Sequence, residues 1–514
     1  MHRILRTTGS LLLGTAAAAL FVTTIDAQKS GDAIRGAASA ANHFVPTPAN
    51  WVHPKTPWGE PDIQATLNMM QAAGIPLERC LAGGRGNAPC DPNKAWLTDE
   101  EFNQRVTAAR GRVDQGRLLI EQGNYGRALL SGVTDPNLPQ RQTSLIVDPP
   151  NGQLPQITAE GKKRALAMGS SWSLPAEDTV YEDALDFDFW DNCRSRGMPS
   201  SMMPYRYNGG FNIRQAPGVV IFDLEMIHDA RVIPTDGRPH PGSAIKQYMG
   251  DSVGHWEGNT LVVETTNYKE GPPMINLAVV GSPAGNRFPV SDKMKTTERI
   301  VRLNNDTWLY EVTTEDPVVL ARPFTVRYPM INDPSYQWWE YGCHEGNTIV
   351  QGYSTTNKHE RENPPVEPPP NKATVAPEIA NALVGKWVGT PRVPTIDYEI
   401  EVEFVKNDDG TIQGKLVGTN LKTFRGKVNP KIDKWLRNFR VGGSPAPPAA
   451  PGGGGRGAGP GGPPPAANPR AMTFEFPNTQ PWTYAGELSA DNTMITGATN
   501  SAQGAATLVF RKRS

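Results

Sequence analysis

The spacing of apolar and polar positions predicts that most of the ordered chain forms β-strands. Residues 219–224 are an apolar run after a Pro-Gly pair, and residues 260–268 alternate between apolar and polar side chains, which is the two-residue period of a strand. Residues 298–303 and 307–315 flank the turn letters NND and predict a hairpin. Consecutive antiparallel strands with tight turns are typical of a barrel or a strongly curved sheet. Further strands are expected at 144–148, 322–329 and 337–343.

Two helices are expected before this β-rich part. Thr98 and Glu101 have the spacing of a capping box, which predicts a surface helix over residues 98–122. Thr158 is a second N-cap residue and predicts a short helix that ends at Ala167.

The fold class is therefore mainly β, with two domains. Residues 28–170 are expected to form extended arms and helices that pack on a β-barrel-like main domain at 171–357. Residues 358–377 are rich in proline and predict a linker. A smaller β-barrel is expected at 378–514, interrupted at 442–470 by a Gly- and Pro-rich run that predicts a disordered loop. Its strands are expected at 396–406, 411–418, 472–476, 482–488 and 505–511.

The composition agrees with this architecture and excludes one class of partner. The chain has 514 residues, more than one ordinary domain. Its 51 glycines and 48 prolines favour turns and long loops over a helical bundle. The 51 Lys and Arg residues balance 52 Asp and Glu residues, so the chain lacks the basic excess of a nucleic-acid-binding protein.

Residues 1–27 have the pattern of a removable secretory signal peptide. His2, Arg3 and Arg6 precede a short apolar run, and an acceptable cleavage site ends at Ala27. The run is shorter than the ~20 residues that a membrane span needs, although an uncleaved N-terminal anchor is the alternative. We therefore expect a periplasmic or secreted protein with no transmembrane segment after signal cleavage.

Export predicts that the four cysteines form disulfides. Cys80 and Cys90 bracket the loop LAGGRGNAP, and Cys193 and Cys343 would then pair across the main domain. Four cysteines allow three connectivities, and this one is chosen by proximity in the sequence. The chain contains no CxxC pair, so thioredoxin-type redox chemistry is not predicted.

The main domain resembles a large group of uncharacterised secreted bacterial proteins. The resemblance covers most of residues 56–347, and the Cys80–Cys90 loop departs from it as an insertion. It implies no particular reaction. The matching runs are TPWGEPDIQ, TSLIVDPPNGQLP, EMIHDARVIPTDGRPH, YMGDSVGHWEGNTLVVETTNY and YGCHEGN.

The C-terminal domain is similar to the lipocalin-like pattern. Gly385 and Trp387 form a Gly-x-Trp in its first strand, and Arg511 lies in its last strand. The resemblance implies that Arg511 packs against Trp387 and closes the bottom of the barrel.

A dense group of ionisable residues in the stretch 218–267 is the first candidate site. If the strand at 219–224 continues, His228 shares a face with its apolar residues. It is then either a core histidine paired with Asp229 or a backbone carbonyl, or a general acid or base. Arg231 would then hold an anionic group, or form a structural ion pair with Asp229. Ionisable groups beside apolar strand residues must pair or face water, because burying them alone is costly.

A second candidate follows the predicted strand at 337–343. His344 and Glu345 lie after the paired tryptophans Trp338 and Trp339, a combination typical of a cleft for a sugar or an aromatic ring. The alternative is a barrel rim tied down by the disulfide at Cys343.

A carboxylate pair and a metal site are two further candidates. Glycoside hydrolysis needs two carboxylates, and Glu225 and Glu264 are the better candidates because Asp251 and Glu257 are expected in turns. A metal site would draw on four histidines, although no HxH or HExxH spacing is present. These histidines are His228, His240, His255 and His344.

The leading hypothesis is an exported hydrolase or lyase that acts on a small or oligomeric substrate, such as a glycoside, by carboxylate and histidine chemistry. The alternative is a non-catalytic periplasmic binding protein for an apolar or aromatic ligand, with Trp256, Trp338 and Trp339 lining its pocket. A metal-dependent hydrolase is the third option. The sequence predicts neither a cofactor nor an oligomeric state. The expected catalytic residues are Glu225, His228, Arg231, Glu264, His344 and Glu345.

Overall fold

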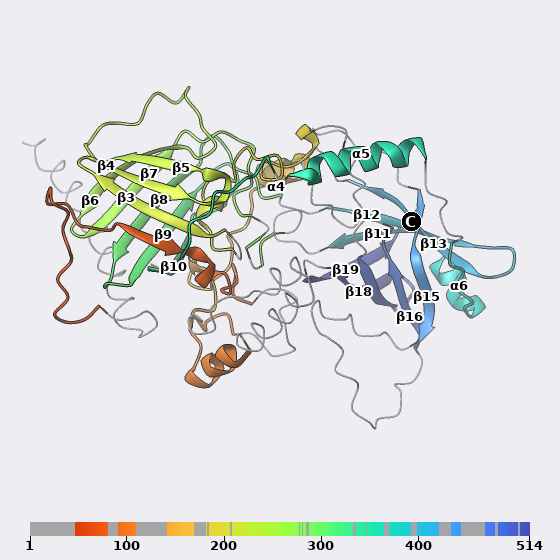
Figure 1. The fold of residues 1–514 in the computed structure, drawn as a ribbon. Helices are drawn as coiled ribbons and strands as arrows, with labels where there is room; N and C mark the ends of the chain where they lie inside the picture. Colours follow the sequence, from red (N-terminus) through yellow and green to blue (C-terminus); the bar gives the residue numbers. More distant parts are fainter. Residues whose placement is uncertain are drawn as a thin grey trace, which may run out of the picture.

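The computed structural model shows two β-sheets, each curled into a nearly closed barrel (Figure 1). The mainly β, two-barrel fold class expected from the sequence is thereby confirmed. The residues that the structure describes are 47–80, 91–108, 141–168, 181, 184–205, 208–276, 278–279, 281–283, 287–332, 336–345, 347–363, 370–391, 398–420, 433–443, 468–477, 482–501 and 504–513.

The first sheet has ten strands, and its neighbouring strands are antiparallel. Their order is β5-β4-β3-β1-β10-β9-β8-β7-β6, and β2 pairs with β10 beside this path. The two end strands, β5 and β6, also contact each other, which nearly closes the barrel. The strands are β1 (Ala65–Asn68), β2 (Ile146–Asp148), β3 (Gly210–Ala216), β4 (Val219–Leu224), β5 (Ala230–Pro234), β6 (Asp251–Glu257), β7 (Thr260–Thr266), β8 (Lys295–Arg302), β9 (Thr307–Glu315) and β10 (Phe324–Asn332).

Alternate residues of these strands fill the barrel interior. Phe222 of β4 pairs in register with Ile213 of β3, and Tyr310 of β9 pairs with Ile300 and Tyr328 on either side. All five side chains are buried. The interior is therefore a packed core, and the intervening residues face outward.

Helices and short turns lie outside the sheets. Residues 99–108 are helical, and the predicted capping box is confirmed, because the backbone N–H of Thr98 donates to Glu101 and that of Glu101 donates to Thr98 Oγ1. The predicted short helix is also present as α4 (Ala159–Ala167), capped by Thr158. The other helices within the described residues are η1 (Met69–Ala72), η2 (Ala184–Asp186), η3 (Ser200–Met202), η4 (Met226–His228), α5 (Thr348–Glu362) and α6 (Pro377–Leu383).

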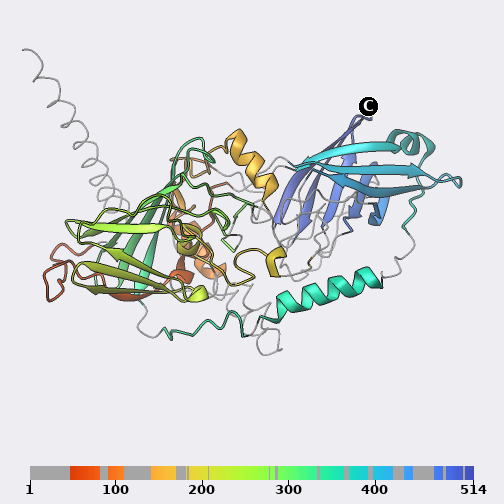
Figure 2. The same ribbon diagram turned by 90° about the horizontal axis from the view of Figure 1, so that it is seen from above.

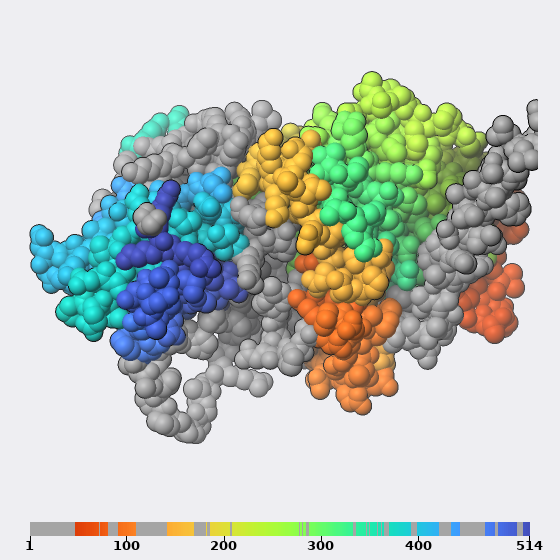
Figure 3. Space-filling model, turned by 180° about the vertical axis from the view of Figure 1, so that it is seen from behind, coloured from red at the N-terminus to blue at the C-terminus, as the bar shows by residue number. Residues whose placement is uncertain are grey.

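Helix α4 lies between the two barrels (Figures 1 and 2). The backbone N–H of its cap, Thr158, donates to the carbonyl of Val319 in the first domain. Ala165 and Leu166, near its other end, pack with the core of the second barrel. In the space-filling view the yellow segment that contains α4 lies between the green and blue parts (Figure 3). The helix therefore contacts both halves of the chain.

Residues 336–345, which we call the Trp338 segment, form no strand. The strand predicted at 337–343 is therefore wrong. Helix α5 follows this segment, and residues 358–362, expected to begin the linker, belong to its last turns. Among the described residues, no helix is long and apolar enough to cross a membrane.

The second sheet has nine strands in the order β14-β13-β12-β11-β19-β18-β17-β16-β15. Its first and last long strands, β11 and β19, pair with each other, as in an up-and-down barrel. Residues 444–467 of the predicted disordered loop lie outside the described residues. The strands are β11 (Gly385–Pro391), β12 (Ile400–Lys406), β13 (Ile412–Thr419), β14 (Lys434–Trp435), β15 (Arg437–Gly443), β16 (Asn468–Glu475), β17 (Thr483–Leu488), β18 (Met494–Ser501) and β19 (Gly504–Lys512).

The second barrel corrects one detail of the lipocalin-like resemblance. Trp387 is buried, and the residue opposite it on β19 is Lys512, whose Nζ lies 5.5 Å from the indole ring. Arg511 is exposed and contacts Met494. Adjacent residues of a strand point to opposite faces, so the cation that covers Trp387 comes from position 512 and not from 511.

Candidate functional site

The chain makes a strained turn where β4 ends, and we call residues 225–229 the η4 corner. Ile227 and His228 have φ angles of 63° and 53°, in the left-handed region that β-branched and bulky residues rarely adopt. Strain of this kind persists only where the surroundings enforce it, and it concentrates at functional sites. The turn also corrects the expectation for His228, which does not continue the strand face of Phe222 but lies exposed on the surface.

A pocket of about 190 Å³ opens at this corner. Arg214 of β3 and Asp223 of β4 point outward from the barrel and form an ion pair, with Nε 2.9 Å from Oδ2. Trp338 is 40% exposed and comes from a segment more than a hundred residues away. The lining residues are Arg214, Asp223, Leu224, His228, Asp229 and Trp338.

Asp229 is the carboxylate of the pocket that is held most firmly. Ser195 Oγ donates a 3.0 Å hydrogen bond to its Oδ2, and the backbone N–H of Arg196 also donates to it. Burial raises the pKa of Asp229, and the bond from Ser195 and the charge of Arg196 oppose that rise. Sequence reasoning considered Asp229 only as an ion-pair partner, since no local pattern reveals Ser195 behind it.

The Trp338 segment contacts the η4 corner through Tyr336 and Tyr341. Tyr336 donates a 2.7 Å hydrogen bond to Glu225 Oε2, and the ring of Tyr341 meets that of His228 edge-on at 6.2 Å. Burial and the Glu225 carboxylate raise the pKa of Tyr336, so its hydroxyl remains a donor. These contacts place Trp338 against the pocket.

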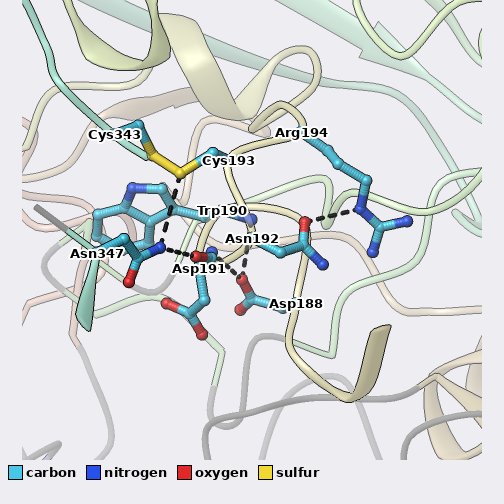
Figure 4. The surroundings of a disulfide bond; sticks show 8 residues. All are labelled: Asp188, Trp190, Asp191, Asn192, Cys193, Arg194, Cys343 and Asn347. Atoms are coloured by element: carbon cyan, nitrogen blue, oxygen red, sulfur yellow. Dashed lines mark hydrogen bonds between the residues drawn. A yellow bond between two sulfur atoms is a disulfide. The ribbon is translucent and has the colours of Figure 1, made fainter. Parts of the chain in front are cut away.

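The predicted disulfide between Cys193 and Cys343 is confirmed and fixes the far end of the segment (Figure 4). Asn347 supports it, because its Nδ2 donates a 2.6 Å hydrogen bond to the carbonyl of Asp191 and lies 3.7 Å from Cys193 Sγ. Cys90 lies outside the described residues, so its pairing with Cys80 stays a prediction.

Glu225 does not reach the pocket. Its side chain is 1% exposed, and its two oxygens accept hydrogen bonds from Asn208 Nδ2 at 2.6 Å and from Tyr336. Gly210 closes the other side, since a Cβ there would contact the Glu225 carboxylate and lie 2.7 Å from the Tyr336 ring. This carboxylate anchors the Trp338 segment instead of facing a ligand.

Arg231 also lies away from the pocket, inside the first barrel. Its guanidinium forms a two-pronged ion pair with Glu298 and bonds Ser252 Oγ at 3.0 Å and Thr265 Oγ1 at 3.2 Å. Tyr310 donates a further 2.7 Å bond to Glu298. Burial acts to lower the pKa of Arg231, but the Glu298 carboxylate outweighs it and raises that pKa. The partner of Arg231 is thus Glu298 and not Asp229.

The remaining predicted catalytic residues lie in other environments. Glu264 is on the outer face of β7, 3.2 Å from Lys295 Nζ. His344 and Glu345 are exposed in the turn after the disulfide. The prediction that Asp251 and Glu257 lie in turns is wrong, because they are the first and last residues of β6.

Of the three predicted ligand-binding tryptophans, only Trp338 lines the pocket. Trp339 is 59% exposed beside it. Trp256 of β6 is half-buried against the core of the first barrel, and its Nε1 has no hydrogen-bond partner within the described residues.

The four histidines of the metal hypothesis are separated. His240 Nδ1 lies 2.6 Å from Asp251 Oδ1, and His255 Nε2 lies 3.4 Å from Glu257 Oε1. His228 is in the pocket and His344 is exposed. Across the described ranges, no three His, Cys, Asp or Glu side chains are grouped so that they could hold a metal ion.

Comparison with known proteins identifies no family or function for the chain. No family model and no curated protein matches the chain. A DUF3598-family protein of unknown function from Nostoc punctiforme is similar over 59% of this chain and 87% of its own, at 10% identity and a TM-score of 0.11. A Transferrin Binding Protein B double mutant from Haemophilus parasuis is similar over 59% of this chain and 65% of its own, at 9% identity and a TM-score of 0.13. Structural likenesses this weak carry no functional argument.

Proposed function

We propose that the protein is an exported, non-catalytic binding protein for a small ligand built on one hydroxyl-rich ring, such as a sugar unit. The observation that carries the proposal is the pocket at the η4 corner, where Trp338 lies beside His228 and Asp229. The Cys193–Cys343 disulfide supports export, since such bonds persist in oxidising compartments.

The chemistry of the lining residues matches such a ligand. The indole of Trp338 offers a flat apolar face on which a ring can stack. Asp223 and Asp229 supply hydrogen-bond acceptors for hydroxyl groups, while Arg214 and His228 supply donors. At about 190 Å³ the pocket is smaller than the about 300–1,000 Å³ typical of drug-sized ligands, and it suits a single ring.

The positions of the expected catalytic residues favour binding over catalysis. Glycoside hydrolysis by acid and base needs two carboxylates on either side of one bond. Of that pair, Glu225 is enclosed by Asn208 and Tyr336, and Glu264 pairs with Lys295 on the outer face of β7. Neither lines the pocket.

The test is a binding titration of the mature protein with glucose, galactose, mannose and their disaccharides, followed by calorimetry. We expect saturable binding, and we expect Trp338→Ala to weaken it about tenfold because the stacking surface is lost. Trp58→Ala is the matched control, since Trp58 is also exposed but bonds Glu60 away from the pocket. Equal affinities for the two variants, or no binding to any sugar, would remove the proposal.

A second candidate function is acid–base catalysis on the same ligand. It is favoured by the raised pKa of Asp229, caused by burial, next to His228 in its strained turn. A carboxyl group of raised pKa can act as a general acid. Product analysis after incubation with the disaccharides that bind separates the two functions, because a binding protein releases its ligand unchanged.

A further inference from the structure

Arg196 is a buried cation that belongs neither to the hydrophobic core of a barrel nor to the lining of the pocket. Its side chain is 1% exposed, and apart from the Tyr205 hydroxyl its three guanidinium nitrogens have no hydrogen-bond partner in the described part of the chain. Burying a charged group without compensation is costly. A residue with this burial therefore needs another source of stabilisation.

Two aromatic rings and one carboxylate provide that stabilisation. The guanidinium carbon lies 3.8 Å from the ring centre of Tyr205 and 5.0 Å from that of Trp190, and stacking on rings suits a planar, weakly hydrated cation. The backbone N–H of Arg196 donates to Asp229, and its charge acts on the same carboxylate. Arg196 thus lies behind the wall of the pocket that Asp229 forms.

The charges around the pocket then balance in pairs. Arg214 and Asp223 neutralise each other across 2.9 Å. The remaining lining carboxylate, Asp229, faces the buried charge of Arg196 and the neighbouring His228. Glu225 is turned away, with its oxygens bonded to Asn208 and Tyr336.

We propose that Arg196 is a positioning residue that compensates Asp229 from behind, so that the pocket selects an uncharged hydroxylated ring over the acid or the amine of the same ring. This inference rests on the proposed function and narrows its ligand class. An acid would meet Asp229 at close range, and an amine would lose water without finding an uncompensated carboxylate. Arg196 contacts no ligand and acts only through Asp229.

The first experiment measures calorimetric affinities at pH 7 for glucose, galactose and mannose, each with its uronate and its 2-amino sugar. We expect the neutral sugar of the set that binds to be at least about tenfold tighter than both charged forms. A uronate or an amino sugar that binds as tightly as its neutral parent overturns the inference and leaves the proposed function standing. Absence of binding by all nine sugars overturns both.

The second experiment tests the residue itself through the pH profile of neutral-sugar binding. In Arg196→Met the lost positive charge disfavours ionised Asp229, so the pH below which affinity falls should move upward by about one unit. Arg196→Lys keeps the charge and should keep the wild-type profile. An unchanged profile in a folded Arg196→Met protein refutes the role. If Arg196→Met has no cooperative melting transition and is therefore unfolded, the Arg196→Lys variant is the test. If the folded Arg196→Lys protein no longer prefers the neutral sugar over its charged forms, the role is refuted.

Discussion

Removal of the Cys193–Cys343 disulfide tests how the pocket is held together. The bond joins residues 150 positions apart, and it ties the Trp338 segment to the turn after Asp191 (Figure 4). That segment has no strand pairing, so its other firm attachment is the bond from Tyr336 to Glu225. Replacing both cysteines by serine leaves the segment fixed at one end.

The size of the effect follows from the length of the closed loop. The chain-entropy model gives about 5 kcal/mol for a separation of this length, and measured losses are typically about 2–4 kcal/mol because the unfolded chain retains structure. We therefore expect the double serine variant to lose about 2–5 kcal/mol in the free energy of unfolding of the first domain. Serine substitution is preferable to a reducing agent, which would act on the other cysteines as well.

The assay combines urea denaturation with peptide-resolved hydrogen exchange. Exchange reports local opening, so peptides that cover residues 336–345 should lose protection first. The second barrel contains none of the four cysteines, and peptides from β17 and β18 serve as the internal control. Under the proposed function, sugar affinity should fall together with the protection of the Trp338 segment, since Trp338 lines the pocket.

One result would refute this reasoning. If the variant keeps its unfolding free energy within about 1 kcal/mol and residues 336–345 stay protected, the bond from Tyr336 alone holds the segment. The disulfide would then be a consequence of the fold and not a condition for the pocket.

Three further predictions concern the core, the close packing at the corner and pH. Arg231→Met should cost about 3–5 kcal/mol in urea denaturation, because it leaves Glu298 charged and buried, whereas replacing both by apolar residues should recover much of this loss. Gly210→Ala should cost about 1–3 kcal/mol by crowding the buried carboxylate, while Gly74→Ala, with nothing within 4 Å of its Cβ, should be tolerated. Asp229 has a folded-state pKa above its unfolded value, so its contribution to stability is present below about pH 3.9 and is lost as pH rises through the folded pKa. Asp229→Asn should remove that part of the decline when unfolding is measured between pH 3 and 8, and an unchanged decline would contradict it.

Sequence patterns correctly predicted those strands and helices whose formation depends on neighbouring residues in the chain. An apolar run after Pro-Gly located β4, the two-residue alternation located β7, and the turn at 304–306 located the hairpin of β8 and β9. The capping residue Thr158 located the start of α4. The short strand β1 was missed because four residues give too little pattern, and it is a strand only through its pairing with β3 and β10. The Trp338 segment shows the converse, since a strand was predicted there but no described strand pairs with its backbone.

The buried ion pair of the first barrel could not be predicted for the same reason. Arg231 and Glu298 are 67 residues apart and meet only because β5 and β8 direct both side chains into one barrel interior. Asp229 lies only two positions before Arg231, just ahead of β5, but it accepts a hydrogen bond from Ser195 instead of pairing with Arg231. Ion-pair partners in a barrel depend on register and closure, which a single stretch of sequence does not contain.

The spacing of Glu225, His228 and Arg231 explains why charge density along a chain is a poor guide to a site. Each lies three positions after the one before it, and on a regular helix all three would lie on one side. The left-handed residues of the η4 corner turn the chain sharply between them, so that the first is enclosed by Asn208 and Tyr336, the second opens to the pocket, and the third enters the barrel. One charged stretch therefore has three separate roles: it anchors the Trp338 segment, lines the pocket and neutralises Glu298. The η4 corner, and not the number of ionisable residues, is what creates the pocket.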